Sequence, residues 1–531
     1  MRRHLPAVMT AVDWVSGRLG RGTRLAIGAL AHAGAQLGRL TMDWVLAPLT
    51  SADQEVRSDL RTLRRRSREL CRNNSYAARF LGLLGENVVG PQGIRLQARI
   101  ETGIDQFDAD INRRIEDAWK RWSLPANASV DGKLSWRDLQ KLVIQGVAQD
   151  GEALVRIIEG YADSEFRFAL QLLDPDQLDL NFDRPRTERS NEVRMGVEVN
   201  EWGRPVAYHI FESHPQDYQT SRGQQRRIRV PASQMIHLFT TRRPGQTRGV
   251  PWLAPVMMDM RMLGGLQEAE LVASRISAAK GGFFTKTAES ALDPKSIRGS
   301  KRQLKMTVEP GVFDQLPEGW DFKAWDPQHP NSAFEAFNTV ILRSIATGLR
   351  SSYSSLTGDL TKVSYSSIRT GALQDRDVYR DLQDWLSTHL HARVRSRWMV
   401  WAITSGQLQL PTSNAAEWDA HTWMPRGWEW VDPLKEMLAA ELAFELRIDS
   451  RTRVAAERGR DYEEVVHDEK RERRIAEAAG LAFDPARDGA RGERSALRED
   501  DEEGRAAVAT ALARRMSRTP ATTGRTNGHH P

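Results

Sequence analysis

The stretch from residue 241 to 255 constrains the fold most, because it is rich in turn residues and leads directly into a long helical pattern. It reads Thr-Arg-Arg-Pro-Gly-Gln-Thr-Arg-Gly-Val-Pro-Trp-Leu-Ala-Pro, and its glycines and prolines favour turns over regular structure. No catalytic type of side chain is concentrated in it, so we interpret it as a structural hinge. The next apolar residues recur at spacings of three and four and predict an amphipathic helix: Val256, Met260, Leu263, Leu266, Ala269, Ala273 and Ile276.

A second amphipathic helix follows the Pro- and Gly-rich, strand-like segment 281–330. Ser332 and Glu335 have the spacing of a capping box, and Gly348 is suited to end the helix. Its apolar stripe consists of Phe334, Phe337, Ile341 and Ile345. The order of helix, compact insert and helix predicts a helical hairpin with a small β-containing module at its tip.

The region before this hairpin, residues 51–250, shows helical patterns first and strand patterns afterwards. Helices are predicted at 51–84, 105–123 and 135–149. Period-two alternation predicts strands, paired as two hairpins with one further strand, at 153–159, 166–173, 193–200, 205–211 and 235–240. Helices followed by hairpins indicate an α+β domain.

The first of these helices is strongly basic, with seven arginines between Arg57 and Arg72. Ser51 and Gln54 resemble a capping box at its start. One interpretation of the arginines is a solvated face; the other is contact with DNA or with an acidic neighbouring subunit. The sequence leaves both open.

The remaining segments differ in composition. Residues 1–50 carry repeated glycines that weaken helices, and we expect a poorly ordered arm. Residues 351–367 are rich in Ser, Thr and Tyr and are expected to form a loop. Helix is predicted again within 368–432 and 433–484, whereas 485–531 lacks large apolar residues and is expected to be a disordered charged tail.

Composition bounds the class of protein. The net charge is only +6 over 531 residues, which argues against a surface coated for tight DNA binding. The single cysteine, Cys71, excludes a disulfide framework or a cysteine-based zinc site within one chain and fits a reducing compartment. No apolar run is long enough for a transmembrane helix, and we expect no membrane association. The 16 tryptophans suit either a large assembly or an ordinary core.

Motifs for common catalytic chemistry are absent. No phosphate-binding loop and no nucleophile elbow occur, which argues against a motor ATPase and against one large class of hydrolases. Asp174, Asp176 and Asp179 have spacings that suit cation binding, but an Asp-Pro turn explains them as well. The histidines give no ligand pattern: those at 209, 214 and 237 would need a coincidence of folding, and those at 389 and 391 are expected on a helix surface.

Several separated blocks resemble the lambda-type bacteriophage portal family, and they occur in the family's order over about 50–470. They are Arg-Arg-Arg-Ser-Arg-Glu-Leu-Cys-Arg-Asn-Asn (64–74), Asn-Val-Val-Gly (87–90), Asp-Gly-Glu (150–152), Leu-Leu-Asp-Pro-Asp-Gln-Leu (172–178), Gly-Val-Glu-Val-Asn-Glu-Trp-Gly-Arg-Pro-Val-Ala-Tyr-His (196–209), Arg-Pro-Gly-Gln-Thr-Arg-Gly-Val-Pro-Trp (243–252), His-Pro (329–330), Tyr-Ser-Ser (365–367) and Trp-Val-Asp-Pro-Leu-Lys-Glu (430–436).

The resemblance implies a ring, usually of twelve subunits, at one capsid vertex, through which double-stranded DNA is packaged and ejected. The implied partners are the terminase large subunit, the major capsid and scaffolding proteins, and the head–tail connector proteins. The implied location is the virion, and the host bacterial cytoplasm during assembly. Such a protein has no catalytic activity, metal or cofactor of its own. The alternatives are a metal-dependent DNA-processing enzyme using the aspartates at 174–179, and a nucleic-acid-binding scaffold without a channel.

The same resemblance divides the chain into the parts of a portal subunit. They are an N-terminal arm (1–50), an α+β wing (51–250), a first stem helix (251–280), a clip (281–330), a second stem helix (331–350), a channel or tunnel loop (351–367), a helical wing or crown segment (368–432), crown helices (433–484) and a charged tail (485–531).

Three sets of candidate residues follow from this division. The candidates for contact with DNA in the channel are Lys362, Arg350, Arg369, Ser354 and Ser355. The candidates for partner binding at the clip are Phe283, Phe284 and Trp325. The candidates for packing between subunits are Leu263, Leu266, Phe337 and Ile341.

Overall fold

The computed structural model describes most of the chain between residues 50 and 480. The described ranges are 50–103, 106–217, 226–278, 282–286, 320–324, 334–361, 364–412, 414–430 and 432–480. The predicted arm (1–50, apart from residue 50) and the charged tail (485–531) lie outside them. None of the helices within these ranges has both the length and the apolar character that a membrane span requires.

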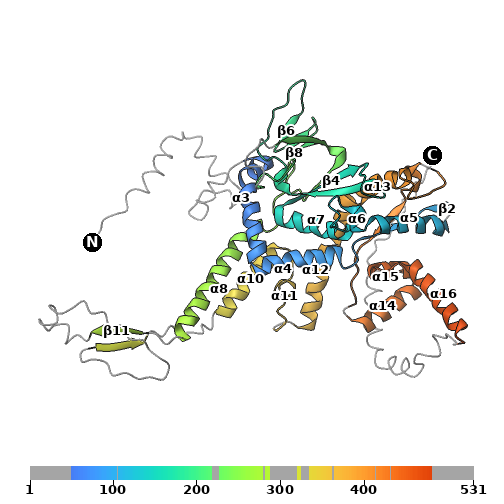
Figure 1. Cartoon of the computed structure of the whole chain (residues 1–531). Coiled ribbons are helices and arrows are strands. Elements are labelled where there is room, and N and C mark those ends of the chain that lie inside the picture. Colours follow the sequence, from blue (N-terminus) through green and yellow to red (C-terminus); the bar gives the residue numbers. More distant parts are fainter. Residues whose placement is uncertain are drawn as a thin grey trace, which may run out of the picture.

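The main parts of the structure can be followed in Figure 1. A mixed body of helices and sheets lies in the centre, and two long helices project from it side by side, α8 (Met257–Ala278) and α10 (Phe334–Gly348). A two-stranded hairpin lies beyond their far ends. On the other side of the body are three further helices, namely α14 (Pro433–Glu445), α15 (Arg451–Glu457) and α16 (Tyr462–Ala478).

The helices of the body agree largely with the apolar periodicity of the sequence. They are α3 (Ala52–Asn73), α4 (Ser75–Leu84), α5 (Ala109–Trp122), α6 (Pro125–Ala128), α7 (Trp136–Asp150), α11 (Tyr353–Thr357), α12 (Tyr365–Leu386) and α13 (Ala392–Thr404), with π-helical turns η3 (Gly85–Val89) and η8 (Ser387–His391).

The helix expected over 51–84 is in fact two helices. Asn74 has an extended backbone, and its side chain accepts hydrogen bonds from the backbone N–H groups of Tyr76 and Ala77. It therefore ends α3 and caps α4 in the manner for which asparagine is well suited. Ser51 caps the first helix as expected, since its side chain accepts from the N–H of Gln54.

Antiparallel sheets make up the rest of the body. A three-stranded sheet has the order β10–β4–β5, from β10 (Met235–Phe239), β4 (Glu152–Glu159) and β5 (Phe168–Leu173). A four-stranded sheet follows chain order, from β6 (Glu192–Arg194), β7 (Val197–Val199), β8 (Pro205–Phe211) and β9 (Arg227–Pro231). Two small pairs complete it, β1 (Arg95–Ala98) with β13 (His421–Met424) and β2 (Glu101–Gly103) with β3 (Gln106–Phe107).

The predicted hairpins are confirmed with small differences. Strands β4 and β5 pair as expected, and β7 pairs with β8 across the Asn-Glu-Trp-Gly turn. The stretch 193–200 is split by a turn into β6 and β7, where Met195 and Gly196 both have positive φ. Strand β9 was not predicted, because it is a charged edge strand with only one buried residue, Val230.

Tryptophans form the centre of the body. Trp119, Trp122, Trp136 and Trp398 are buried, and neighbouring ring centroids lie 4.7–6.4 Å apart. His391 is also buried here, with its ring 5.1 Å from that of Trp136. The expectation of a surface position was therefore wrong for His391, while its neighbour at 389 is exposed. These tryptophans thus form part of the core of the single chain, which was one of the two explanations considered for the large number of tryptophans.

Beside this core lies a buried group of charges centred on Glu152, whose side chain has no exposed surface. Arg248, equally buried, donates from Nε to both carboxylate oxygens of Glu152 at 2.9 Å. Arg64 donates to Glu152 Oε1 at 2.8 Å, and the Nε2 of His237 lies 2.9 Å from Oε2. Burial alone would raise the pKa of Glu152, but Arg248, His237 and Arg64 together hold it well below its usual range.

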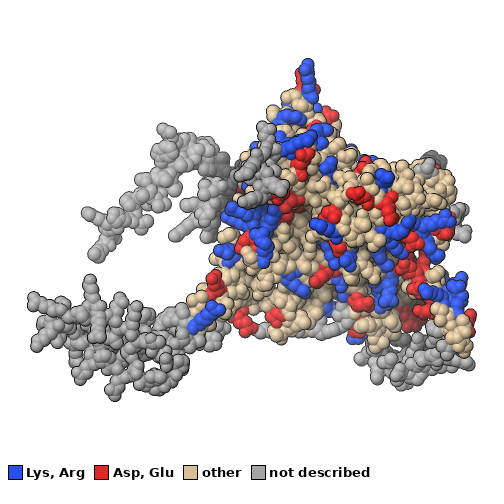
Figure 2. Space-filling model, viewed as in Figure 1, with Lys and Arg blue, Asp and Glu red and all other residues tan. Residues whose placement is uncertain are grey.

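Arg64 and Arg68 fit neither of the two interpretations of the basic helix, a solvated face or contact with DNA or a neighbouring subunit. Arg64 also pairs with Asp176 at 2.6 Å, and Arg68 pairs with Asp150 at 2.7 Å and Asp176 at 2.8 Å. These two arginines are neither solvated nor free for a partner; they hold α3 against the loop that follows β5. The remaining arginines of α3 gather on its exposed side (Figure 2).

The hinge of residues 241–255 is fixed by a close backbone approach. A Cβ atom on Gly249 would lie 1.9 Å from the carbonyl oxygen of Gly151, so no larger residue fits there. The N–H of Gly249 donates to Glu152 Oε2 at 3.1 Å. The hinge therefore packs directly on the end of α7 and the start of β4, which sets the direction in which α8 leaves the body.

Replacing Glu152 by Gln is expected to destabilise the body strongly. The substitution keeps the shape but leaves Arg248 and Arg64 buried beside a neutral group, which costs about 3–5 kcal/mol. Thermal unfolding of Glu152→Gln measures this, with Glu192→Gln as the matched control, because Glu192 pairs with Arg194 at the surface. The control should cost less than about 1 kcal/mol. Equal shifts for both variants would contradict the importance of the buried group.

The free energy of unfolding is expected to fall between pH 7 and pH 5. Burial lowers the pKa of His391 to about 4 and also lowers that of His237. An unfolded histidine has a pKa near 6.5, so between these values the unfolded chain binds more protons and is favoured as the pH falls. His391→Leu should flatten the dependence by up to about 1.4 kcal/mol per pH unit. His389→Leu, at an exposed site, serves as the control and should leave the slope unchanged.

Candidate functional site

The two projecting helices pack on each other through one face. Leu263 of α8 is 1% exposed, and Leu342 and Ile345 of α10 are also buried in the same apolar core. At the base of the pair, a Cβ atom on Gly348 would lie 2.4 Å from Val256, so glycine allows α10 to approach the start of α8 closely. Leu263 is therefore covered within its own chain. The expectation that it contacts a neighbouring subunit is corrected accordingly, because the base of α8 faces α10 and the body.

A second apolar face of the same helices remains uncovered. Met262 of α8 is 67% exposed, and Phe337 and Val340 of α10 are 56% and 62% exposed. Leu266 and Ile341, also expected to pack between subunits, are half-buried. The apolar spacing of the sequence identified Phe337 but missed Met262 and Val340, because it assigned one stripe to helices that have apolar residues on two sides.

The segment 351–367 is partly folded. Ser352 caps the short helix α11, and Ser355 donates from Oγ to Asp375 Oδ2 at 2.6 Å. Ser352 donates to the same carboxylate oxygen at 2.7 Å, and Asp375 is buried. The hydroxyl of Ser355 is thus engaged inside the chain, which corrects its expected availability for DNA. Local spacing could not reveal this, because the acceptor lies on α12.

The other candidates for DNA contact differ in their exposure and in their partners. Ser354 is half-buried, and its carbonyl accepts from the N–H of Gly358. Arg350 is exposed and has a φ of 56°, two residues after the end of α10. Arg369 lies 3.5 Å from Glu436 of α14. Lys362 lies outside the described residues.

The expected module at the tip of the helices contains one described hairpin. Strand β11 (Gly282–Lys286) pairs antiparallel with β12 (Trp320–Ala324). In this register Phe284 lies opposite Phe322, and Phe283 lies opposite Lys323. Trp325 lies just outside the described residues. The predicted β content of 281–330 is therefore present in its two ends.

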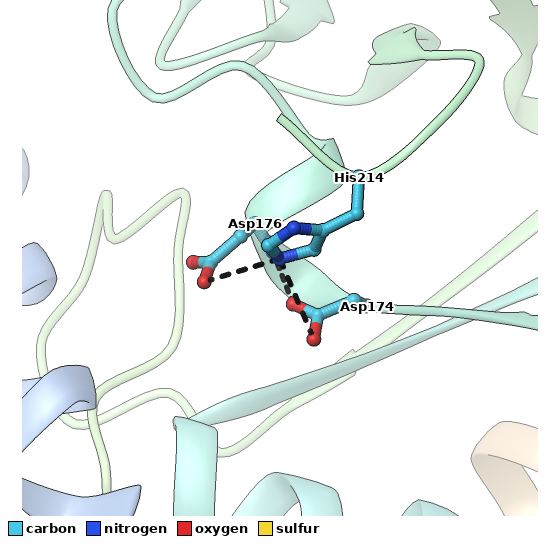
Figure 3. A group of neighbouring side chains, drawn as sticks. All are labelled: Asp174, Asp176 and His214. Carbon is cyan, nitrogen blue, oxygen red and sulfur yellow. Dashed lines mark hydrogen bonds and ion pairs between the residues drawn. The ribbon is translucent and has the colours of Figure 1, made fainter. Parts of the chain in front are cut away.

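The aspartates considered as cation ligands form one group with a histidine. The Nε2 atom of His214 lies 3.9 Å from Oδ2 of both Asp174 and Asp176 (Figure 3). Within the described residues, these three offer ligand atoms within 4.8 Å of one another. Asp179 is not part of the group; it pairs with Arg227 at 2.7 Å.

The neighbours of this group do not suit a metal ion. Arg68 binds Asp174 at 2.9 Å and Asp176 at 2.8 Å, and Arg64 binds Asp176 at 2.6 Å. Although burial raises the pKa of Asp176, Arg64 lowers it overall. A cation at this position would face two guanidinium groups that already use the carboxylate oxygens. The group therefore stabilises the packing of α3 on the body. It does not support the alternative of a metal-dependent enzyme that uses these aspartates.

The other histidines have separate partners. The Nε2 atom of His209 lies 3.2 Å from Glu198, and that of His237 lies 2.9 Å from Glu152. Neither of them lies with His214 in the group described above.

Four of the sequence blocks that carry the portal resemblance meet at the buried charges. Block 64–74 supplies Arg64, block 150–152 supplies Glu152, and block 243–252 supplies Arg248. Block 172–178 supplies the two aspartates that bind Arg68. Motifs far apart in the sequence thus form one interaction.

Comparison with known proteins points to the same family. The family described as "Phage portal protein, lambda family" matches residues 37–383. The chain is 35% identical over 435 residues to the probable portal protein of Halomonas phage phiHAP-1, which covers 80% of this chain and 83% of that protein. It is 25% identical over 474 residues to portal protein B of Escherichia phage lambda, covering 82% and 87%.

Solved structures similar to this chain include the neck of a native GTA particle computed with C12 symmetry. The TM-score is 0.38 at 15% identity, covering 74% of this chain and 93% of that one. The family match spans more than half of the 531 residues, and the Halomonas phage relative exceeds 30% identity over most of both chains. This chain therefore belongs to the lambda family of phage portal proteins, and its role is that of a phage portal.

Proposed function

We propose that copies of this chain, twelve by resemblance, close into a ring at one capsid vertex, through which double-stranded DNA enters and leaves. The observation that carries the proposal is the uncovered apolar face of α8 and α10, which includes Met262, Phe337 and Val340. Large apolar side chains exposed together on two adjacent helices are characteristic of protein–protein contacts. In this proposal the face of one subunit packs against the same helices of its neighbours.

The helices after residue 432 support the same assembly. Helices α14, α15 and α16 contain no buried residue in the single chain. Their exposed apolar residues include Leu434, Met437 and Ile475. Helices that cannot bury an apolar face within their own chain need a partner for stability, and neighbouring copies would supply one.

In this proposal, the segments of the chain correspond to the parts of a portal subunit. Residues 51–250 form the wing, 251–280 and 331–350 the stem, and 281–330 the clip. Residues 351–367 form the channel loop, and 433–484 the crown. The clip, with Phe283, Phe284 and Trp325 as candidate anchors, docks the terminase large subunit and later the head–tail connector proteins. The major capsid and scaffolding proteins contact the ring during assembly in the host cytoplasm, and the ring remains in the virion.

Phe337→Asp is expected to prevent ring assembly while the single chain still folds. An unpaired carboxylate in an apolar contact costs several kcal/mol at each interface. Mass photometry measures the oligomer, and circular dichroism checks the fold. Trp202→Asp is the matched control, because Trp202 is 85% exposed at the turn between β7 and β8. The proposal fails if the wild-type chain is monomeric, or if Phe337→Asp assembles as well as the control.

Lys362→Glu is expected to leave rings intact and to lower the amount of DNA that is packaged or retained. A channel with only a few fixed cations lets DNA slide. Each additional phosphate contact would release counterions and bind the DNA more tightly. Reversing the one lysine of this loop places a repelling charge beside the phosphates. Packaged genome length is measured in a complementation assay, with Lys120→Glu on the exposed side of α5 as the control. Normal packaging by Lys362→Glu would remove the channel role of this residue.

A further inference from the structure

A basic cleft at the surface of the body is lined by no residue of α8, of α10 or of the segment 351–367. It has a volume of about 630 Å³ and lies between α3 and the loops at 176–181 and 211–216. Arg61, Arg65 and Arg72 line it together with Arg64 and Arg68. Figure 2 shows basic side chains gathered over α3.

The arginines of this cleft fall into two groups. Arg64 and Arg68 are matched by carboxylates, as described above. Arg65 and Arg72 are exposed, and no carboxylate of the described chain lies within ion-pair distance of either. Arg61, also exposed, reaches only the amide oxygen of Asn181 at 3.5 Å. Three guanidinium groups therefore point toward solvent without compensation of their charge.

Their spacing forms a ridge along one side of the helix. Positions 61, 65, 68 and 72 are four, three and four residues apart, which places them on one face. At a rise of 1.5 Å per residue, the ridge is about 16 Å long. One strand of duplex DNA presents a phosphate roughly every 3.4 Å along the axis, so the ridge spans about five phosphates.

The other charged groups that face the cleft do not offset this ridge. Asp176 is held by Arg64 and Arg68, and Asp179 by Arg227. The aromatic rings in the lining are those of Phe211 and His214. Arg227 lies 5.9 Å from the ring centre of Phe211, and the Nε2 atom of His214 lies 3.9 Å from Asp174 and Asp176. Arginines outnumber aromatic rings in this lining, so the chemistry favours a phosphate backbone over stacked single-stranded bases.

We propose that this cleft, lined by Arg61, Arg65 and Arg72, binds the phosphate backbone of duplex DNA outside the channel. The proposal rests on the proposed function, which brings DNA to this protein. It adds a second contact, on the proposed wing and separate from the proposed channel loop. Planar guanidinium groups bind phosphate oxygens in pairs, and this binding does not depend on sequence.

The test uses relaxed, closed-circular duplex DNA, which cannot thread through a closed ring. Its binding to the full-length protein is measured over a range of salt concentrations. Arg65→Gln with Arg72→Gln should reduce the steepness of log K against log salt by about 1.8 for each subunit that contacts DNA. Arg66→Gln with Arg113→Gln is the charge-matched control, at exposed positions outside the cleft, and should leave the slope unchanged. Arg65→Lys keeps the charge and should also leave it unchanged.

Three results would overturn the cleft proposal while leaving the portal function intact. The wild-type protein could form rings that do not bind the circle. The cleft variant and the control could have equal slopes. An acidic peptide such as a poly-glutamate 12-mer could bind in a manner that depends on Arg65 and Arg72 while the circle does not, which would make the cleft a docking site for protein. Failure of the wild-type chain to form rings would instead contradict the proposed function, whatever the slopes.

Discussion

The buried carboxylate of Glu152 is the interaction on which the arrangement of the body depends. It joins the hinge through Arg248, the basic helix through Arg64 and strand β10 through His237, three partners from three separate segments. A buried charge of this kind is stable only when its partners are all in place. The group therefore fixes where α3 lies and where the hinge releases α8, and the uncovered apolar face of α8 and α10 takes its direction from both.

Local patterns predicted the elements whose structure is determined locally. Helices α8 and α10, the Ser51 cap and the pairing of β4 with β5 follow from neighbouring residues and were found as expected. The break at Asn74 was missed because the helical pattern continues on both sides of it. The sequence predicts an asparagine cap of this kind only where the apolar periodicity of the helix is also interrupted.

The remaining differences arise from contacts between distant residues. Arg64 looks like any other arginine of a basic helix, and its burial depends on Glu152 and Asp176, far away in the sequence. Ser355 looks available until Asp375 is placed beside it, and His391 looks exposed until the tryptophans surround it. Of the candidate sites, the sequence placed Phe337 and Ile341 on a helix, as the structure does, but it expected Ser354 and Ser355 in a loop, whereas they lie on α11. It could not decide which of them were already engaged within the chain.

The central claim is that the uncovered face of α8 and α10 becomes buried between copies of this chain. Electron cryo-microscopy of the purified oligomer tests it most directly, because it shows both the symmetry and the residues at each contact. The account predicts a closed ring, with Phe337 and Val340 of each subunit covered by the neighbouring one. A ring in which these two side chains remain exposed to solvent, or an open and unclosed assembly, would contradict it.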